Sequence, residues 1–330
     1  MQPISYARPA SLASAISTLA AGGASTRVLA GGTTLYDLMK LDVEQPERIV
    51  DINNLGELAA FDTSGDELVF GALARMSDVS ADARLTNEFP ALSEALWKAA
   101  SQQLRNMASL GGNLLQRTRC AYFRHGAPFA CNKRSPGSGC AAIEGLNRGH
   151  ALFGGSDACI ATYPGDFAVA LVAFDAQIDI AGPDGERTIP LSALHRQPGD
   201  NPRHDTILLP EEIIVRIRVP ADIVGRASTY HKIRDRESYA FAVVSAAAAV
   251  RFEAGVVADA RLALGGVATV PWRAREAERS LLGKPLTPET ARAAGELAFT
   301  DAATRQHDAF KVELGANVVR DALLIASGRF

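Results

Sequence analysis

The chain has 330 residues, of which 47 % are hydrophobic and 22 % are charged, with a formal net charge of −3. This composition is typical of a globular protein of two or three domains, and it gives no bulk attraction to nucleic acid or to an anionic membrane. No apolar run reaches the roughly 18 residues of a membrane span, and the first residues lack the basic-then-apolar layout of a signal peptide.

The predicted elements mix helices and strands along the whole chain. Apolar residues at helical spacing predict a helix at 11–21, which Ser11 can cap, and a second helix that Thr33 or Thr34 can cap. The same spacing predicts helices at 89–100, at 164–175 and in the tail from 287. Apolar runs and alternating patterns predict strands at 27–30, 48–52, 67–72, 176–181 and 213–219, and then at 229–233, 242–252 and 258–264. Pro183-Asp184-Gly185 predicts a hairpin turn after the strand at 176–181. A second unit therefore begins near residue 222, and the fold class is α+β.

All the cysteines of the chain lie in one irregular stretch rich in Gly, Pro and Arg, residues 116–163, which we call the cysteine segment. Cys120, Cys131, Cys140 and Cys159 are separated by ten, eight and eighteen residues. No Cys-x-x-Cys pair occurs, which argues against a zinc ribbon or a thioredoxin-like redox pair. An irregular segment of this length inside a compact domain needs an internal organiser.

Several interpretations of the cysteine segment are open from its residues alone. Two disulfides suit a secreted protein, four thiolates suit a structural zinc ion, and buried cysteines can be inert. A [4Fe-4S] cluster also needs four thiolates and tolerates wide spacing between them. Residues 116–160 contain six Arg or Lys against two acidic residues, which suits the negative charge of a thiolate-bound cluster. This charge balance favours the iron–sulfur interpretation.

Two Gly-Gly turns precede the cysteine segment. In the first, a strand at 28–30 runs through Gly31-Gly32 into a helix start, a turn that can aim backbone N–H groups at a pyrophosphate. Taken alone, this turn is better explained as a tight strand–helix connection that needs glycine. The second turn, in residues 104–114, contains Gly111-Gly112, and two such turns could clamp one dinucleotide. No G-x-G-x-x-G motif occurs, which disfavours a Rossmann site.

The two turns, in this order, resemble those of the FAD-binding subunits of the xanthine dehydrogenase and aldehyde oxidase family of molybdenum hydroxylases. The matching stretches are AGGTTL at 30–35, QLRNMASLGGNL at 103–114, LLPEEIIVRIRVP at 208–220, YHKIRDRESYAFAVVSAAAAV at 230–250 and ALGGVATVPWRAREAE at 263–278. The resemblance implies a PCMH-type FAD-binding domain of two subdomains at 1–221, like that of vanillyl-alcohol oxidase and CO dehydrogenase flavoproteins. A small C-terminal α/β domain would occupy 222–330.

The cysteine segment is an insertion that most members of this family lack. LLQRTRC, CNKRSPGSGCAA and ACIAT resemble the insertion in the flavin subunit of bacterial periplasmic aldehyde oxidoreductases. The resemblance implies a [4Fe-4S] cluster bound by Cys120, Cys131, Cys140 and Cys159. The chain departs from the family at Ala99, where an aromatic residue is frequent, so this position supplies no ring to stack on the flavin.

The same resemblance implies the residues that bind FAD. Residues 29–35 would hold the pyrophosphate through backbone N–H groups, and residues 109–113 would close over it. Asp166 would bond the ribose or ribityl part, Leu209 would pack near the adenine and Lys232 would lie near the isoalloxazine. From the residues alone, Asp166 could instead cap a helix, Leu209 belong to the core and Lys232 be a solvated strand charge. The full set is Leu29, Ala30, Gly31, Gly32, Thr33, Thr34, Leu35, Ser109, Gly111, Gly112, Asn113, Asp166, Leu209 and Lys232.

The resemblance further implies an electron-transfer subunit with no catalytic acid or base of its own. In a heterotrimer, a large subunit with molybdopterin cytosine dinucleotide would oxidise an aldehyde to a carboxylic acid. A small subunit with two [2Fe-2S] clusters would pass the electrons to FAD in this chain, and FAD would pass them to an external acceptor. The complex would be periplasmic, exported on a partner's signal, or cytoplasmic. Alternatives are a subunit of a xanthine or N-heterocycle dehydrogenase, a non-redox assembly module with a zinc-bound insertion, and a self-sufficient flavin oxidase of the vanillyl-alcohol-oxidase type.

Overall fold

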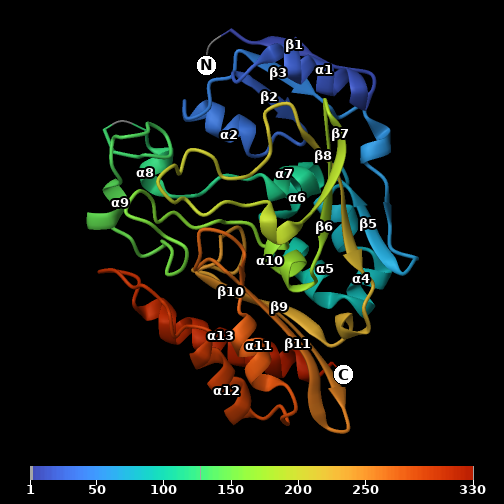
Figure 1. Ribbon diagram of the computed structural model, residues 1–330, viewed down its shortest axis with the longest axis vertical. Coiled ribbons are helices and arrows are strands. Elements are labelled where there is room, and N and C mark those ends of the chain that lie inside the picture. Colours follow the sequence, from blue (N-terminus) through green and yellow to red (C-terminus); the bar gives the residue numbers. More distant parts are fainter. Residues whose placement is uncertain (1–2, 127, 330) are drawn as a thin grey trace.

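The computed structural model describes residues 3–126 and 128–329, in which three β-sheets follow one another along the chain (Figure 1). The first is a parallel sheet with the strand order β1-β3-β2, and two helices accompany it. Ser11 caps the first helix by accepting a hydrogen bond from the N–H of Ser14, as the sequence predicted. The elements are β1 (Ser5–Ala7), α1 (Leu12–Gly22), β2 (Thr26–Leu29), α2 (Leu35–Lys40) and β3 (Arg48–Asp51).

The second sheet is antiparallel, with the strand order β4-β5-β8-β6-β7. Its strands are β4 (Phe61–Asp62), β5 (Glu67–Gly71), β6 (Gln177–Gly182), β7 (Gly185–Pro190) and β8 (Ile213–Pro220). Its helices are α3 (Met76–Ser80), α4 (Ala83–Glu88), α5 (Pro90–Trp97), α6 (Gln102–Met107), α7 (Leu110–Leu114) and α10 (Phe167–Ala173), with 3₁₀ turns at Gly56–Leu58 and Leu191–Ala193. β6 and β7 form the hairpin that the sequence predicted around residues 183–185.

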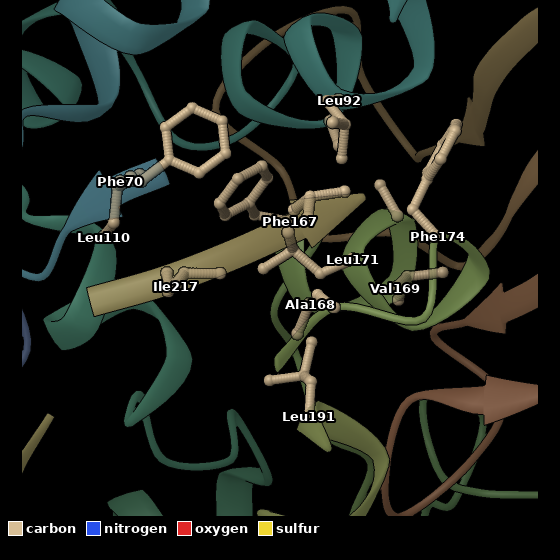
Figure 2. Close-up of a cluster of buried hydrophobic side chains, with 14 of the residues drawn as sticks. Phe70, Leu92, Leu110, Phe167, Ala168, Val169, Leu171, Phe174, Leu191 and Ile217 are labelled. Carbon is tan, nitrogen blue, oxygen red and sulfur yellow. The ribbon is translucent and has the colours of Figure 1, made fainter. Parts of the chain in front are cut away.

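Helix α10 is the centre of the main hydrophobic core (Figure 2). All seven of its residues are buried, which explains why its sequence FAVALVA has no polar face. Phe167 packs edge-on against Phe70 of β5, with 6.3 Å between the ring centroids, and Phe174 packs in the same way against Phe89. α10 therefore joins the five-stranded sheet to the helices that precede the cysteine segment.

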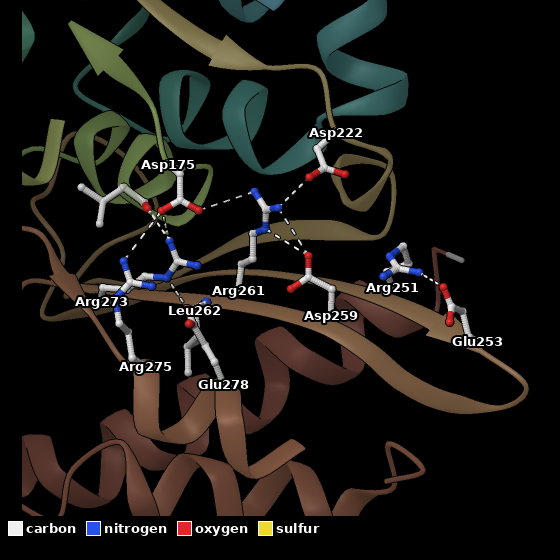
Figure 3. A network of polar contacts seen from close by, with 11 residues as sticks. Asp175, Asp222, Arg251, Glu253, Asp259, Arg261, Leu262, Arg273, Arg275 and Glu278 are labelled. Atoms are coloured by element: carbon white, nitrogen blue, oxygen red, sulfur yellow. Dashed lines mark hydrogen bonds and ion pairs between the residues drawn. The ribbon is translucent and has the colours of Figure 1, made fainter. Parts of the chain in front are cut away.

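The third sheet is antiparallel, with the strand order β12-β11-β10-β9; α11 and α13 pack on it, and α12 packs on these two helices. Its elements are β9 (Ser228–Ile233), β10 (Val244–Glu253), β11 (Val256–Gly265), β12 (Trp272–Arg273), α11 (Arg275–Leu281), α12 (Pro288–Leu297) and α13 (Phe310–Ser327), after a 3₁₀ turn at Ile223–Gly225. A polar network joins this sheet to the rest of the molecule (Figure 3). Asp175 binds Arg273 at 2.9 Å, and Arg261 binds Asp222 at 2.6 Å.

The cysteine segment lies to one side of the three sheets and holds two short helices, α8 (Ala121–Arg124) and α9 (Ala141–Glu144) (Figure 1). The predicted helices and strands are present within about three residues of their expected ends, except that the helical tail from 287 is divided into α12 and α13 by residues 298–309. The fold class of the sequence analysis is confirmed. α5 ends sooner than predicted because Ala100 takes a left-handed φ of 48°. Among the described residues, no helix is long and apolar enough to cross a membrane.

Candidate functional site

The first Gly-Gly turn exposes a row of backbone donors. Among the described residues, the N–H groups of Gly31, Gly32, Thr33 and Thr34 donate no hydrogen bond, although this stretch is half-buried. Gly32 has a φ of 72°, which explains why glycine occupies this position. Thr34 stands at the N-cap of α2, but its side chain accepts no hydrogen bond, so the predicted threonine cap is wrong. Four consecutive amides are thus free for an acceptor such as a phosphate.

The structure brings the two Gly-Gly turns into contact. A Cβ on Gly31 would lie 2.0 Å from the carbonyl oxygen of Met107 and 3.0 Å from Cα of Ala108, so only glycine fits there. Met107 and Ala108 lead directly into Ser109, the N-cap of α7. The predicted stretches 29–35 and 109–113 therefore lie next to each other.

The second turn offers side-chain groups rather than backbone donors. The N–H groups of Leu110 and Gly111 bond the carbonyls of Ala74 and Ala72, and that of Gly112 bonds Ser109 Oγ. Asn113 Oδ1, in contrast, is buried and has no hydrogen-bond partner in the described part of the chain. An unpartnered buried amide oxygen is costly unless a ligand donates to it. The donor row of the first turn and the orphaned oxygen of the second fit a dinucleotide between them.

Two residues that the sequence analysis missed hold the turns together. Asn53 Nδ2 donates to the carbonyl oxygen of Ala30 at 2.8 Å and to Asp51 Oδ1 at 2.7 Å. Arg75 donates to Asn53 Oδ1 at 3.3 Å and to the carbonyl oxygen of Met107. A sequence signal exists for Asn53, because it lies two residues after the end of β3, the parallel neighbour of β2, and both strands end at the same edge of the sheet.

Asp166 and Lys232 form a buried ion pair of 2.7 Å, with only 5 % and 1 % of their side chains exposed. The hydroxyl of Tyr230 donates to the other oxygen of Asp166 at 2.6 Å, and burial followed by the charge of Asp166 raises the pKa of Tyr230 well above its usual value. Lys232 Nζ also donates to the carbonyl of Lys98. Asp166 stands at the N-cap of α10 without capping it. Its interpretation as a cap and that of Lys232 as a solvated charge are therefore wrong.

Leu209 lies on the surface with 53 % of its area exposed, so its interpretation as a core residue is wrong. Its backbone N–H is held by Glu212 Oε2 at 2.9 Å. Ala99, where the family often carries an aromatic residue, is buried. An exposed leucine on a fixed backbone is available for contact with a ligand.

The cysteine segment gathers its four thiols without joining them. All four cysteines are free, so the structure does not show the disulfides of one interpretation. Cys131 and Cys140 face each other across an isolated antiparallel bridge. Burial raises the pKa of Cys120 to about 12, and the charges of Cys131 and Cys159 add to it. Burial also raises the pKa of Cys159; the charge of Lys133 opposes this shift, and the charges of Cys140 and Cys131 add to it. The four sulfurs are therefore near enough to interact electrostatically.

The spacing of these thiols bears on which metal group they fit. Among the described residues, no three side chains of His, Cys, Asp or Glu converge as ligands of one metal ion. A zinc ion needs its ligands in contact with a single centre, whereas a cubane cluster spreads its four thiolates over four iron atoms. Among the described residues, the four thiols therefore do not form the single-centre site of a zinc ion. His150 Nε2, 3.3 Å from Cys120 Sγ, is a contact that the sequence analysis missed.

The basic residues of the segment have other partners than the thiols. Arg119 and Arg124 bind Asp37, Arg117 binds Glu44 and Asp205, Lys133 binds Asp205, and Arg148 binds Asp235. Arg134 donates to backbone carbonyls of Tyr122 and Phe123. These partners largely neutralise the Arg and Lys residues that the sequence analysis placed around a cluster. The excess of basic residues in the segment is therefore weak support for a negatively charged cluster.

Comparison with known proteins identifies the family. Residues 2–222 match a family described as the FAD binding domain in molybdopterin dehydrogenase. Residues 228–326 match the CO dehydrogenase flavoprotein C-terminal domain. The chain belongs to the FAD-binding medium subunits of the molybdenum hydroxylases. As such, it is a subunit of an oxidoreductase.

Individual members of this family cover almost the whole chain. The aldehyde oxidoreductase FAD-binding subunit PaoB of Escherichia coli is 43 % identical over 298 residues, which are 90 % of each chain. The carbon monoxide dehydrogenase medium chain of Hydrogenophaga pseudoflava is 28 % identical and covers 98 % of this chain and 97 % of its own. A carbon monoxide dehydrogenase structure from the same organism superposes with a TM-score of 0.77, covering 99 % of this chain and 98 % of that one. These medium chains are parts of multi-subunit enzymes, and their fold is the fold of this chain.

Proposed function

We propose that the chain binds FAD between its two Gly-Gly turns and passes electrons from a partner subunit to an external acceptor. The observation that carries this proposal is the row of free amides from Gly31 to Thr34, closed by the second turn. Bound FAD supplies the ability to take up two electrons and release them singly. The chain itself contributes position and electrostatics, so we assign no catalytic acid or base.

The residues have separate tasks in this proposal. Residues 29–35 donate backbone N–H groups to the pyrophosphate, and Asn113 accepts a hydrogen bond from the bound nucleotide through Oδ1. Ser109, Gly111 and Gly112 shape the second turn, and Leu209 covers the adenine. Lys232, held by Asp166, places a fixed positive charge beside the isoalloxazine. The flavin-binding part would comprise residues 1–221 and the smaller C-terminal domain residues 222–330.

The cysteine segment, in the same proposal, holds one [4Fe-4S] cluster on Cys120, Cys131, Cys140 and Cys159. Support comes from the four free thiols of one segment, whose charges act on one another. A cluster crosslinks a long irregular segment, as a disulfide or a zinc ion does elsewhere. We propose that its role is mainly structural.

The enzyme would be an aldehyde oxidoreductase, because a relative at 43 % identity bears that name, whereas a relative named as a xanthine dehydrogenase subunit is 28 % identical. The chain would assemble with a small subunit that carries two [2Fe-2S] clusters and a large subunit that carries molybdopterin cytosine dinucleotide. Aldehyde oxidation would take place on the large subunit. The partners' export signal, where present, would decide between periplasm and cytoplasm.

Analysis of the purified full chain under anaerobic conditions tests the proposal. We expect about four iron, about four acid-labile sulfide and about one FAD per chain. About one zinc without sulfide would replace the cluster by a zinc site and leave the flavin proposal standing. Absence of FAD from protein that is folded and assembled with its partners would overturn the flavin proposal.

The role of the cluster has its own test in the assembled complex. Cys140→Ser removes one thiolate, and in complexes that still assemble we expect substrate to reduce the bound flavin at the wild-type rate. Loss of electron flow to the flavin in an intact complex would instead make the cluster a relay.

A further inference from the structure

We propose that the cysteine segment supports the first Gly-Gly turn through Asp37, so that a filled cluster strengthens the binding of FAD and bound FAD stabilises the cluster. This inference rests on the proposed function. Asp37 acts in it as a positioning residue, because it lies on α2, which begins directly after the turn.

Two arginines of the cysteine segment bind Asp37. Arg124 reaches both carboxylate oxygens, with Nη2 at 3.1 Å from Oδ1 and Nη1 at 2.9 Å from Oδ2. Arg119, the residue before Cys120, places Nη1 at 3.0 Å from Oδ2. Burial alone would raise the pKa of Asp37, but the hydrogen bonds and charges of the arginines outweigh it and hold the pKa below its usual value. A two-pronged arginine contact of this kind fixes direction as well as distance.

A second carboxylate ties the strand that enters the turn to the same segment. Glu44 Oε1 accepts from Arg117 at 2.5 Å, while Glu44 Oε2 lies 3.0 Å from Arg27 of β2. The Glu44 side chain is largely buried, so these contacts are poorly screened by solvent. The turn is thereby held on both sides, by Glu44 through β2 and by Asp37 through α2.

An apolar cluster completes the contact and includes two of the proposed cluster ligands. Leu38 of α2 packs with Phe123 and Cys131, all of them buried, and Cys120 and Val43 pack against this group. If Cys120 and Cys131 shift when the cluster is absent, the surface beneath Leu38 shifts with them. α2 has only six residues, and so short a helix depends on tertiary packing for its position.

Coupling between two ligand sites is reciprocal by thermodynamic necessity. If the cluster raises the affinity for FAD by some factor, bound FAD must raise the affinity for the cluster by the same factor. The ion pairs of Asp37 are the contacts through which this factor can be changed without touching either site.

The first experiment measures FAD binding to the full chain with its cluster reconstituted, by the quenching of flavin fluorescence. Asp37→Asn keeps the size of the side chain and removes its charge, and we expect the Kd for FAD to rise by about 5- to 150-fold. Asp179→Asn is the matched control, because Asp179 also lies between two arginines, Arg216 at 3.1 Å and Arg218 at 3.0 Å, but in the second sheet. Its Kd should equal that of the wild type.

A double-mutant cycle separates coupling from a purely local effect. Cys140→Ser lacks a complete ligand set, and we expect it to bind FAD more weakly than wild type does. Adding Asp37→Asn to this variant should raise the Kd for FAD by a smaller factor than Asp37→Asn does in the wild-type chain. The visible absorbance of the cluster should, in turn, fade faster in Asp37→Asn than in wild type after the flavin has been removed. Arg124→Gln breaks the same pair from the other side and replaces Asp37→Asn if that variant does not fold.

The outcomes distinguish the two proposals. The coupling is overturned if wild type and Asp37→Asn bind FAD with equal affinity. It is also overturned if Asp37→Asn lowers the FAD affinity equally with and without the cluster. Both outcomes leave the proposed function intact. A wild-type chain that binds no FAD overturns the proposed function itself.

Discussion

Asp166 and Lys232 are two side chains whose charges the fold holds away from water. They come from the N-cap of α10 and from β9, and their ion pair of 2.7 Å is supplemented by Tyr230 and by the carbonyl of Lys98. A buried pair of this kind adds little net stability, but the removal of one partner leaves the other charge uncompensated. We therefore expect the pair to position the charge of Lys232 beside the proposed flavin and to contribute little net stability.

The first prediction tests this asymmetry. Lys232→Met should lower the free energy of unfolding by about 3–5 kcal/mol, because it leaves the carboxylate of Asp166 buried and unpaired. Arg148→Met is the control, since its ion pair with Asp235 is more than half exposed and should contribute no more than about 1 kcal/mol. Urea unfolding of the full chain measures both. Equal losses in the two variants would show that the Lys232 pair is not a buried charge pair in solution.

The sequence analysis expected Asp166 and Lys232 to contact different parts of the flavin. It did not predict that the two side chains bind each other. They are 66 positions apart, and their contact depends on how the third sheet lies against α10. Ser11, in contrast, was identified as a cap because a cap depends on residues three positions away. Residue roles set by local geometry could be read from the sequence, whereas those set by packing between domains could not.

At the scale of elements, the candidate site is built where two turns meet. Each turn was predicted from its Gly-Gly pair, because strand and helix ends leave local signals. The contact between Gly31 and Met107, and the links through Asn53 and Arg75, were not predicted, since they join segments more than 20 residues apart. The partners of the arginines in the cysteine segment were missed for the same reason, so a count of charges overestimated the positive potential around the thiols.

The second prediction uses the contact between the turns. Gly31→Ala places a Cβ 2.0 Å from the carbonyl oxygen of Met107, so the turns must separate. Overpacking costs about 1–3 kcal/mol, which corresponds to a loss of FAD affinity of about one to two orders of magnitude. Gly56→Ala is the control, because no atom lies within 4 Å of its added Cβ. Fluorescence titration with FAD measures both variants. An unchanged Kd in Gly31→Ala would place the flavin elsewhere.

Across the whole molecule, the cysteine segment contacts both neighbouring parts of the fold. On one side, Arg119 and Arg124 bind α2 beside the first turn. On the other, Lys311 of α13 is fully buried and donates to the carbonyls of His150 and Gly266. The segment thus lies between the flavin-binding part and the C-terminal helices, which makes it a structural joint as well as a candidate cluster site.

The third prediction concerns this joint. Burial lowers the pKa of Lys311 to about 8, with Asp308 opposing the shift and Arg148 adding to it. The unfolded chain keeps the ordinary lysine pKa near about 10.4, so between these values the unfolded state binds more protons and stability rises with pH. Below about pH 8 the full cost of burying the charge is present, and above about pH 10.4 it is gone.

Relative to Lys311→Met, the wild type should therefore gain up to about 3 kcal/mol of unfolding free energy as the pH rises from about 8 to about 10.4. Urea unfolding of both proteins across this range gives the difference, in which the other titrating groups cancel. Lys284→Met, which changes an exposed lysine, should show no such trend against wild type. A difference between wild type and Lys311→Met that stays constant with pH would mean that the ammonium group reaches water, and that α13 does not hold the cysteine segment through it.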